Sequence, residues 1–189
     1  MENLSDNVAK QSEKQTSLLQ NSLYYGLLTG VAYIVVSLLY YALEVDQTGW
    51  LNYLTFIILL IGIFIGTKAY RDKHSGGFLS YGRCVGSGVM ISLVVGIIMS
   101  VFTYTFYEFF DPSELTKIVD LTEQKMADQG LSDQEIEQAM AISSKFMTPL
   151  VMSLTVVFGM VFWGTIFSLI ISIFIKKEND SFDATYSES

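Results

Sequence analysis

The basic residues of the chain gather at two places where they could bind the phosphate groups of anionic lipids. One is the stretch from Lys68 to Arg83, between two long apolar runs, and the other is the Lys176-Lys177 pair that ends the last apolar run. A basic residue close to a membrane surface contributes about 1 kcal/mol of attraction to anionic lipids. The same residues could instead only fix the orientation of the chain, and both interpretations stay open. The candidate residues are Lys68, Arg71, Lys73, Arg83, Lys176 and Lys177.

Other side chains with versatile chemistry are few. His74 is the only histidine and lies in this hydrophilic stretch, so we expect a solvated side chain and not a ligand or a base. Cys84 is the only cysteine, which excludes an internal disulfide and a zinc site with repeated Cys or His ligands. We expect Cys84 to be a small packing residue. The Gly76-Gly77 pair lacks the following Lys and Ser or Thr of a phosphate-binding loop.

Acidic residues are numerous between residues 111 and 148, but their spacing does not match a calcium-binding loop. We expect them to form the solvated faces of two helices. No nucleophile elbow, zinc-protease helix or pair of acids within an apolar run is present. The sequence therefore predicts no enzyme activity, no metal or other cofactor and no defined small-molecule substrate. The net charge of −8 argues against nucleic acid as a partner. The acids considered are Asp120, Glu123, Asp128, Asp133, Glu135 and Glu137.

Four long apolar runs, none of which contains a charged residue, separate the basic and acidic segments and must position them. The chain is 51% apolar and 14% aromatic, which is typical of a protein whose solvent is a lipid bilayer. A helix of about 23 residues rises roughly 34 Å and can cross a hydrocarbon core of about 30 Å. The predicted spans are residues 21–43, 50–67, 84–107 and 149–175.

Between the third and fourth spans, residues 111–148 are predicted to form an amphipathic helical hairpin. Asp111 is a suitable N-cap and Gly130 a suitable terminator for its first helix. The segment from Ser132 to Glu135 carries a capping-box pattern that opens its second helix. The apolar faces could cover the outer ends of the spans, lie in the membrane interface or meet a partner.

Small residues recur every four positions in the spans and predict close packing between helices. Such stripes let helix backbones approach each other where lipid removes the usual hydrophobic drive for association. The longest stripe belongs to the third span, which we therefore expect at the centre of the bundle. It consists of Gly88, Ser92, Gly96 and Ser100.

The distribution of basic residues predicts the orientation. Four spans put both termini and the stretch from Lys68 to Arg83 on one side, with eight of the eleven basic residues. The opposite side holds only Lys117, Lys125 and Lys145. By the positive-inside rule, the polar segment 1–20 and the tail 178–189 are cytoplasmic. We expect the tail to be disordered. The hairpin is then extracytoplasmic.

Several short motifs make the chain similar to the domain-of-unknown-function 4199 family, over roughly residues 22–177. The family consists of small four-span proteins, mostly from Bacteroidetes. The resemblance implies the cytoplasmic (inner) membrane of a bacterium, and it brings no known activity and no functional residues. The motifs are Tyr70-Arg71-Asp72-Lys73, Gly76-Gly77-Phe78-Leu79-Ser80-Tyr81-Gly82-Arg83, Phe109-Phe110-Asp111-Pro112, Gly130-Leu131-Ser132 with Glu135-Ile136-Glu137, and Lys176-Lys177.

These observations predict an all-α integral membrane four-helix bundle with an extracytoplasmic amphipathic hairpin. The expected function is that of a non-enzymatic structural or accessory protein. It would act through helix packing, formation of a homo-oligomer, or a membrane-protein partner bound at the hairpin. The alternative is a small transporter or channel subunit, because an oligomer could line a pore with hydroxyl side chains.

Overall fold

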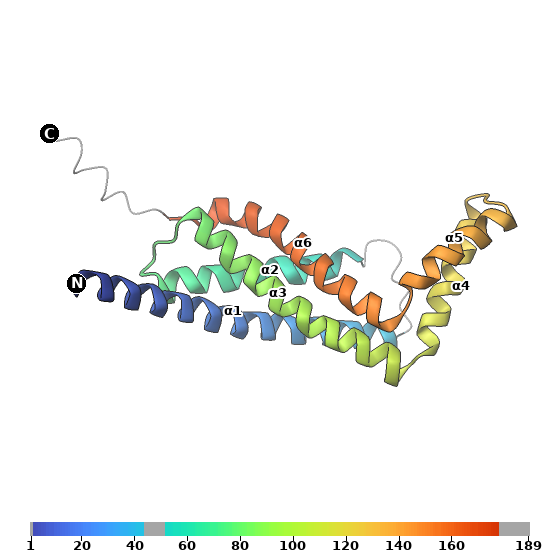
Figure 1. The fold of residues 1–189 in the computed structure, drawn as a ribbon, viewed down its shortest axis with the longest axis horizontal. Helices are drawn as coiled ribbons and strands as arrows, with labels where there is room; N and C mark the ends of the chain where they lie inside the picture. Colours follow the sequence, from blue (N-terminus) through green and yellow to red (C-terminus); the bar gives the residue numbers. More distant parts are fainter. Residues whose placement is uncertain (1, 44–51, 178–189) are drawn as a thin grey trace. The chain divides into compact units, whose positions relative to one another are not determined.

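A computed structural model describes residues 2–43 and 52–177 of the chain, and this part is all-α (Figure 1). Its only β-type pairing is an isolated antiparallel bridge between Leu79 and Lys177. Residues 44–49, between the first two predicted spans, and the predicted disordered tail 178–189 lie outside the described residues. The described helices are α1 (Glu2–Ala42), α2 (Asn52–His74), α3 (Tyr81–Thr105), a π-helical turn η1 (Phe106–Phe110), α4 (Ser113–Asp128), α5 (Asp133–Phe146) and α6 (Pro149–Ile175).

Four of these segments are long and apolar enough to cross a membrane, which confirms the predicted all-α class with four apolar helices. They are Ser17–Ala42, Tyr53–His74, Tyr81–Phe110 and Pro149–Ile175.

The second of these helices is longer than the predicted span 50–67, because α2 continues through the basic residues to His74. Lysine and arginine are good helix formers, and basic side chains in the last turn interact favourably with the helix dipole. Helix α2 stops where Gly76 and Gly77 adopt φ values of +62° and +84°. Only Ser75–Ser80, hereafter the connection, is therefore non-helical between α2 and α3.

The chain forms two compact units, Met1–Gly96 with Met160–Ser189, and Ile97–Gly159. In the first unit, α1 and α2 approach each other closely at two glycines of α2. A Cβ atom added at Gly62 would meet the side chain of Thr29, and one added at Gly66 would meet Tyr25. The buried Asn21 amide donates a hydrogen bond to the carbonyl oxygen of Gly66 at 3.0 Å. These contacts fix the register between the two helices.

Helices α3 and α6 meet through two reciprocal glycine–serine pairs in the same unit. Gly88 of α3 lies against Ser168 of α6, and Gly164 of α6 lies against Ser92 of α3. Each serine hydroxyl donates to the carbonyl four residues earlier, from Ser92 to Gly88 at 2.8 Å and from Ser168 to Gly164 at 2.6 Å. The hydroxyls are therefore satisfied within their own helices, and the interface requires only small volume.

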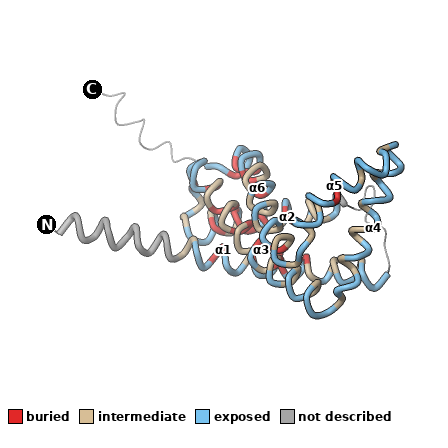
Figure 2. The backbone as a smooth tube through the Cα atoms, turned by 45° about the vertical axis from the view of Figure 1, so that its right-hand side comes forward, coloured by how far each residue is buried: buried red, intermediate tan, exposed pale blue. Residues whose placement is uncertain are grey.

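The other two members of the predicted stripe differ in their burial. Gly96 is buried and Ser100 is half-buried. Around the stripe, the most enclosed apolar side chains are Leu59, Ile63, Ile91 and Val95. Figure 2 shows that nearly all buried positions belong to α1, α2, α3 and α6.

The second unit contains α4 and α5. The carboxylate of Asp111 accepts a hydrogen bond from the Ser113 N–H at 3.1 Å at the start of α4. Gly130 adopts a φ of +84° after α4, a conformation that favours glycine. At the start of α5, the Glu135 carboxylate accepts hydrogen bonds from the Ser132 N–H at 2.8 Å and the Ser132 hydroxyl at 2.7 Å.

These two hydrogen bonds hold the pKa of Glu135 below its ordinary value. A carboxyl group with a lowered folded-state pKa stabilises the fold above its unfolded-state pKa, and this contribution is lost as the pH falls through the folded-state value. The cap of α5 is therefore intact at neutral pH and weakens in acid.

We predict that Gly88→Ala lowers the stability of the first unit, by about 1–3 kcal/mol, because the new methyl group would collide with Ser168 and Ile63. Gly86→Ala is the matched control two residues earlier on α3, since nothing lies within 4 Å of its added Cβ. Thermal unfolding of the full chain in mild detergent measures both. Equal unfolding midpoints for the two variants would contradict this packing.

Candidate functional site

The six basic residues singled out above lie at one end of the first unit, hereafter the basic end. They come from the last turns of α2, the first turn of α3 and the end of α6. The structure brings Arg71 and Lys177 together with the connection. Arg71 is half-buried, and the other five residues are exposed.

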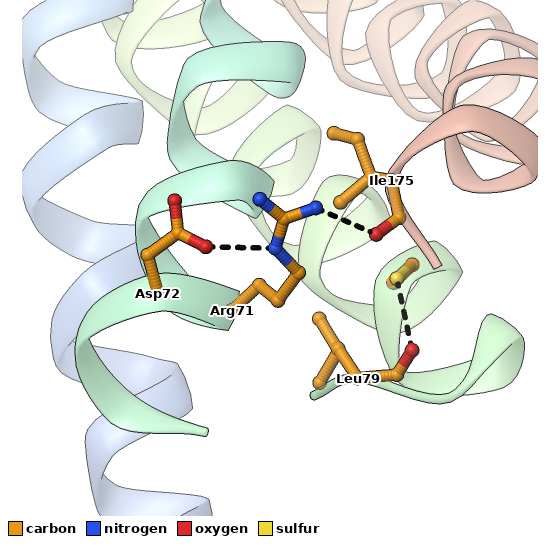
Figure 3. A network of polar contacts seen from close by, with 5 residues as sticks. Arg71, Asp72, Leu79 and Ile175 are labelled. Atoms are coloured by element: carbon orange, nitrogen blue, oxygen red, sulfur yellow. Dashed lines mark hydrogen bonds and ion pairs between the residues drawn. The ribbon is translucent and has the colours of Figure 1, made fainter. Parts of the chain in front are cut away.

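Arg71 is engaged by the protein itself. Its Nη1 donates a hydrogen bond to the carbonyl oxygen of Ile175 at 3.0 Å, and its Nε donates to the Asp72 carboxylate at 2.7 Å (Figure 3). Ile175 is the last residue of α6, where backbone carbonyls have no partner within the helix. A guanidinium there satisfies one carbonyl and opposes the negative end of the helix dipole. Arg71 therefore joins α2 to α6.

The connection is attached to the end of α6 by backbone pairing. The Leu79 N–H donates to the Lys177 carbonyl at 2.8 Å, and the Lys177 N–H donates to the Leu79 carbonyl at 3.0 Å. The Lys177 ammonium lies 5.4 Å from the centre of the Phe78 ring, a distance that allows a cation–π interaction. The side chain of Leu79 is buried beneath this pairing. The connection is thus held at its backbone and at two side chains.

Cys84 has a structural environment. It is fully buried, and its Sγ lies 3.9 Å from the carbonyl oxygen of Leu79. A buried thiol that faces a carbonyl is a small packing group and a weak donor.

Lys73 and His74 have a different environment, because they line a cavity of about 330 Å³ between the middle of α1 and the C-terminal end of α2. The α1 side of this cavity is formed by Gln20, Asn21, Tyr24 and Tyr25. The sequence analysis did not connect these α1 residues with the basic stretch. Gln20 and Asn21, followed one helical turn later by Tyr24 and Tyr25, form a pattern that the sequence shows. The register between α1 and α2 is needed to place Lys73 opposite this pattern.

Four buried hydroxyl groups have no hydrogen-bond partner among the described residues, namely those of Ser22, Thr67, Ser87 and Ser172. Each comes from a different apolar helix. Ser22 and Thr67 follow the hydrogen-bonded pair Asn21 and Gly66 on their helices. An unpaired buried hydroxyl is costly, so these four groups are the least expected feature of the core.

No group of three or more His, Cys, Asp or Glu side chains in the described ranges lies close enough together to hold a metal ion. The basic end can bind anions and can join helices through hydrogen bonds.

We predict that Arg71→Gln destabilises the protein by about 1–2 kcal/mol, because the carbonyl of Ile175 loses a charged donor. Arg83→Gln removes the same charge from an exposed position on α3 and should change stability by less than about 0.5 kcal/mol. Thermal unfolding in detergent gives the comparison. If the two variants unfold at the same temperature, Arg71 does not join α2 to α6.

Comparison with known proteins agrees with the sequence resemblance. Residues 24–177 match the family described as "Protein of unknown function (DUF4199)". No curated protein and no solved structure matches the chain. Since the match covers most of the chain, including the connection, the basic end and both helices of the second unit, the chain belongs to the DUF4199 family.

Proposed function

We propose that the protein is a non-enzymatic accessory protein of the bacterial inner membrane that binds a membrane-protein partner through α4 and α5. In this proposal the four apolar helices span the membrane, the basic end is cytoplasmic and the hairpin of α4 and α5 is extracytoplasmic. The excess of basic residues at one end supports this orientation by the positive-inside rule.

The contacts at the basic end support a structural role for that end. Arg71 is bonded to the end of α6, the backbone of Lys177 is paired with Leu79, and Cys84 is buried. Groups that could have acted on a substrate are therefore used to hold helices together.

The observation that carries the proposal is the small amount of burial in α4 and α5. Met140 is the only buried residue of the two helices. Three large apolar side chains on them are more than half exposed: Leu121 at 54%, Ile142 at 63% and Phe146 at 63%. Ile142 and Phe146 are four residues apart, so they lie on one face of α5. Two exposed apolar side chains on one face give α5 a place where a partner could dock.

The experiment is site-specific photo-cross-linking in intact cells that produce the full chain. A photoreactive amino acid at Phe146 should give a discrete cross-linked product, because this position would contact the partner. Ser144, which is exposed on the opposite side of the same helix, two residues from both Ile142 and Phe146, is the matched control and should give little or none. A second variant, Ile142→Ser, should weaken the product at residue 146 without lowering the amount of protein. Equal cross-linking from both positions, or only to lipid, would contradict a protein partner at this face.

The alternative function, a small transporter or channel subunit, is favoured by the four unpaired hydroxyls. One lies on each apolar helix, and a path for a small polar solute needs such groups inside a membrane protein. Solute flux into vesicles that contain the purified protein would distinguish this function. Flux that is lost in a Thr67→Val variant of unchanged stability would favour it over the accessory role.

A further inference from the structure

We propose that the cavity between the middle of α1 and the C-terminal end of α2 binds the head group of an anionic phospholipid, with Lys73 as the residue that contacts its phosphate. This inference depends on the membrane location in the proposed function. It assigns a ligand to residues that belong neither to the hairpin of α4 and α5 nor to the contacts that join the connection to α6.

The cavity has rigid walls. Asn21 is buried and its amide nitrogen donates to the Gly66 carbonyl of the facing helix at 3.0 Å, directly beside the cavity. The Tyr24 and Tyr25 rings meet edge to face with their centres 5.1 Å apart. The His74 ring lies 6.0 Å from the Tyr70 ring. The first contact joins α1 to α2, and the two ring contacts lie within α1 and within α2, beside the cavity of about 330 Å³.

The lining favours an anion. Its six residues are one lysine, one histidine, two amides and two phenols, and none is acidic. No carboxylate in the part of the chain with described side chains pairs with Lys73. Amide N–H, phenol O–H and ammonium groups all donate hydrogen bonds to phosphate oxygens. The cavity is large enough for a phosphate and the polar group attached to it.

The surface next to the cavity fits acyl chains. Tyr24 lines the cavity, and Leu27, Leu28 and Val31 follow it on the same side of α1 at helical spacing. These three apolar side chains are all exposed, with Leu27 at 59% and Leu28 at 58%. A polar cavity that continues into an exposed apolar strip matches the two parts of a phospholipid.

The position and the charge distinguish a lipid from a soluble phosphate. The cavity lies where the apolar segment of α1 begins and that of α2 ends, which is the level of lipid head groups. A single lysine in an open cavity attracts free phosphate only weakly. Each acyl CH₂ group that is buried adds affinity, so a lipid gains binding free energy that inorganic phosphate cannot.

The test uses the full chain purified in mild detergent and measures retention of dioctanoyl phosphatidylglycerol by native mass spectrometry. We expect binding to the unchanged protein, weaker binding of dioctanoyl phosphatidylcholine, and no measurable binding of inorganic phosphate. Lys73→Gln should reduce phosphatidylglycerol binding about tenfold, as loss of one charged contact predicts, and Lys73→Arg should keep it. Lys68→Gln, which removes an exposed charge outside the cavity on the same helix, is the matched control.

Each other outcome overturns the inference. Equal binding of both lipids would remove the role of charge, and binding of phosphate as tight as that of phosphatidylglycerol would make the site one for soluble phosphates. An equal effect of Lys68→Gln and Lys73→Gln would show general attraction without this cavity. Fractionation of cell membranes distinguishes failure of the lipid site from failure of the proposed membrane location. If the chain is found in the membrane fraction but does not retain the lipid, only the lipid site is refuted.

Discussion

The attachment of the connection to the end of α6 is the interaction on which the first unit depends. Apolar helices in lipid gain little from hydrophobic association with one another, so their order must come from close packing and from polar contacts near their ends. Here Arg71 supplies a charged hydrogen bond to Ile175, and Leu79 and Lys177 exchange two backbone hydrogen bonds. Together they hold α2, α3 and α6 at the basic end. The two glycine–serine pairs join α3 to α6 further along these helices.

This arrangement divides the six basic residues into two groups that the sequence alone could not separate. Arg71 and Lys177 contact the protein through a carbonyl, a carboxylate, a backbone bridge and an aromatic ring. Lys68, Lys73, Arg83 and Lys176 point to solvent or, in the case of Lys73, line the cavity with His74. The choice between orientation and lipid binding can therefore be tested separately for each group. We assign lipid binding to Lys73, which lines the cavity with His74.

The four apolar helices could be predicted from charge-free length, because the bilayer imposes that length directly. The family could also be predicted, since its motifs lie in the connection and the hairpin. The continuation of α2 to His74 is not predicted by the apolar run 50–67, because basic residues after such a run are compatible both with a loop and with a helix C-terminus. The cavity was missed because it depends on the register of α1 against α2. That register is set by Asn21, Gly62 and Gly66, whose contacts no local pattern reveals.

The central claim is that the basic end is cytoplasmic while the hairpin of α4 and α5 lies on the other side of the membrane. Cysteine labelling tests it most directly, in a Cys84→Ser background with single cysteines at exposed Lys125 or Lys176. In spheroplasts treated with a membrane-impermeant maleimide, Lys125→Cys should be labelled at once and Lys176→Cys only after permeabilisation. Labelling of both positions from outside, or of residue 176 alone, would contradict the account.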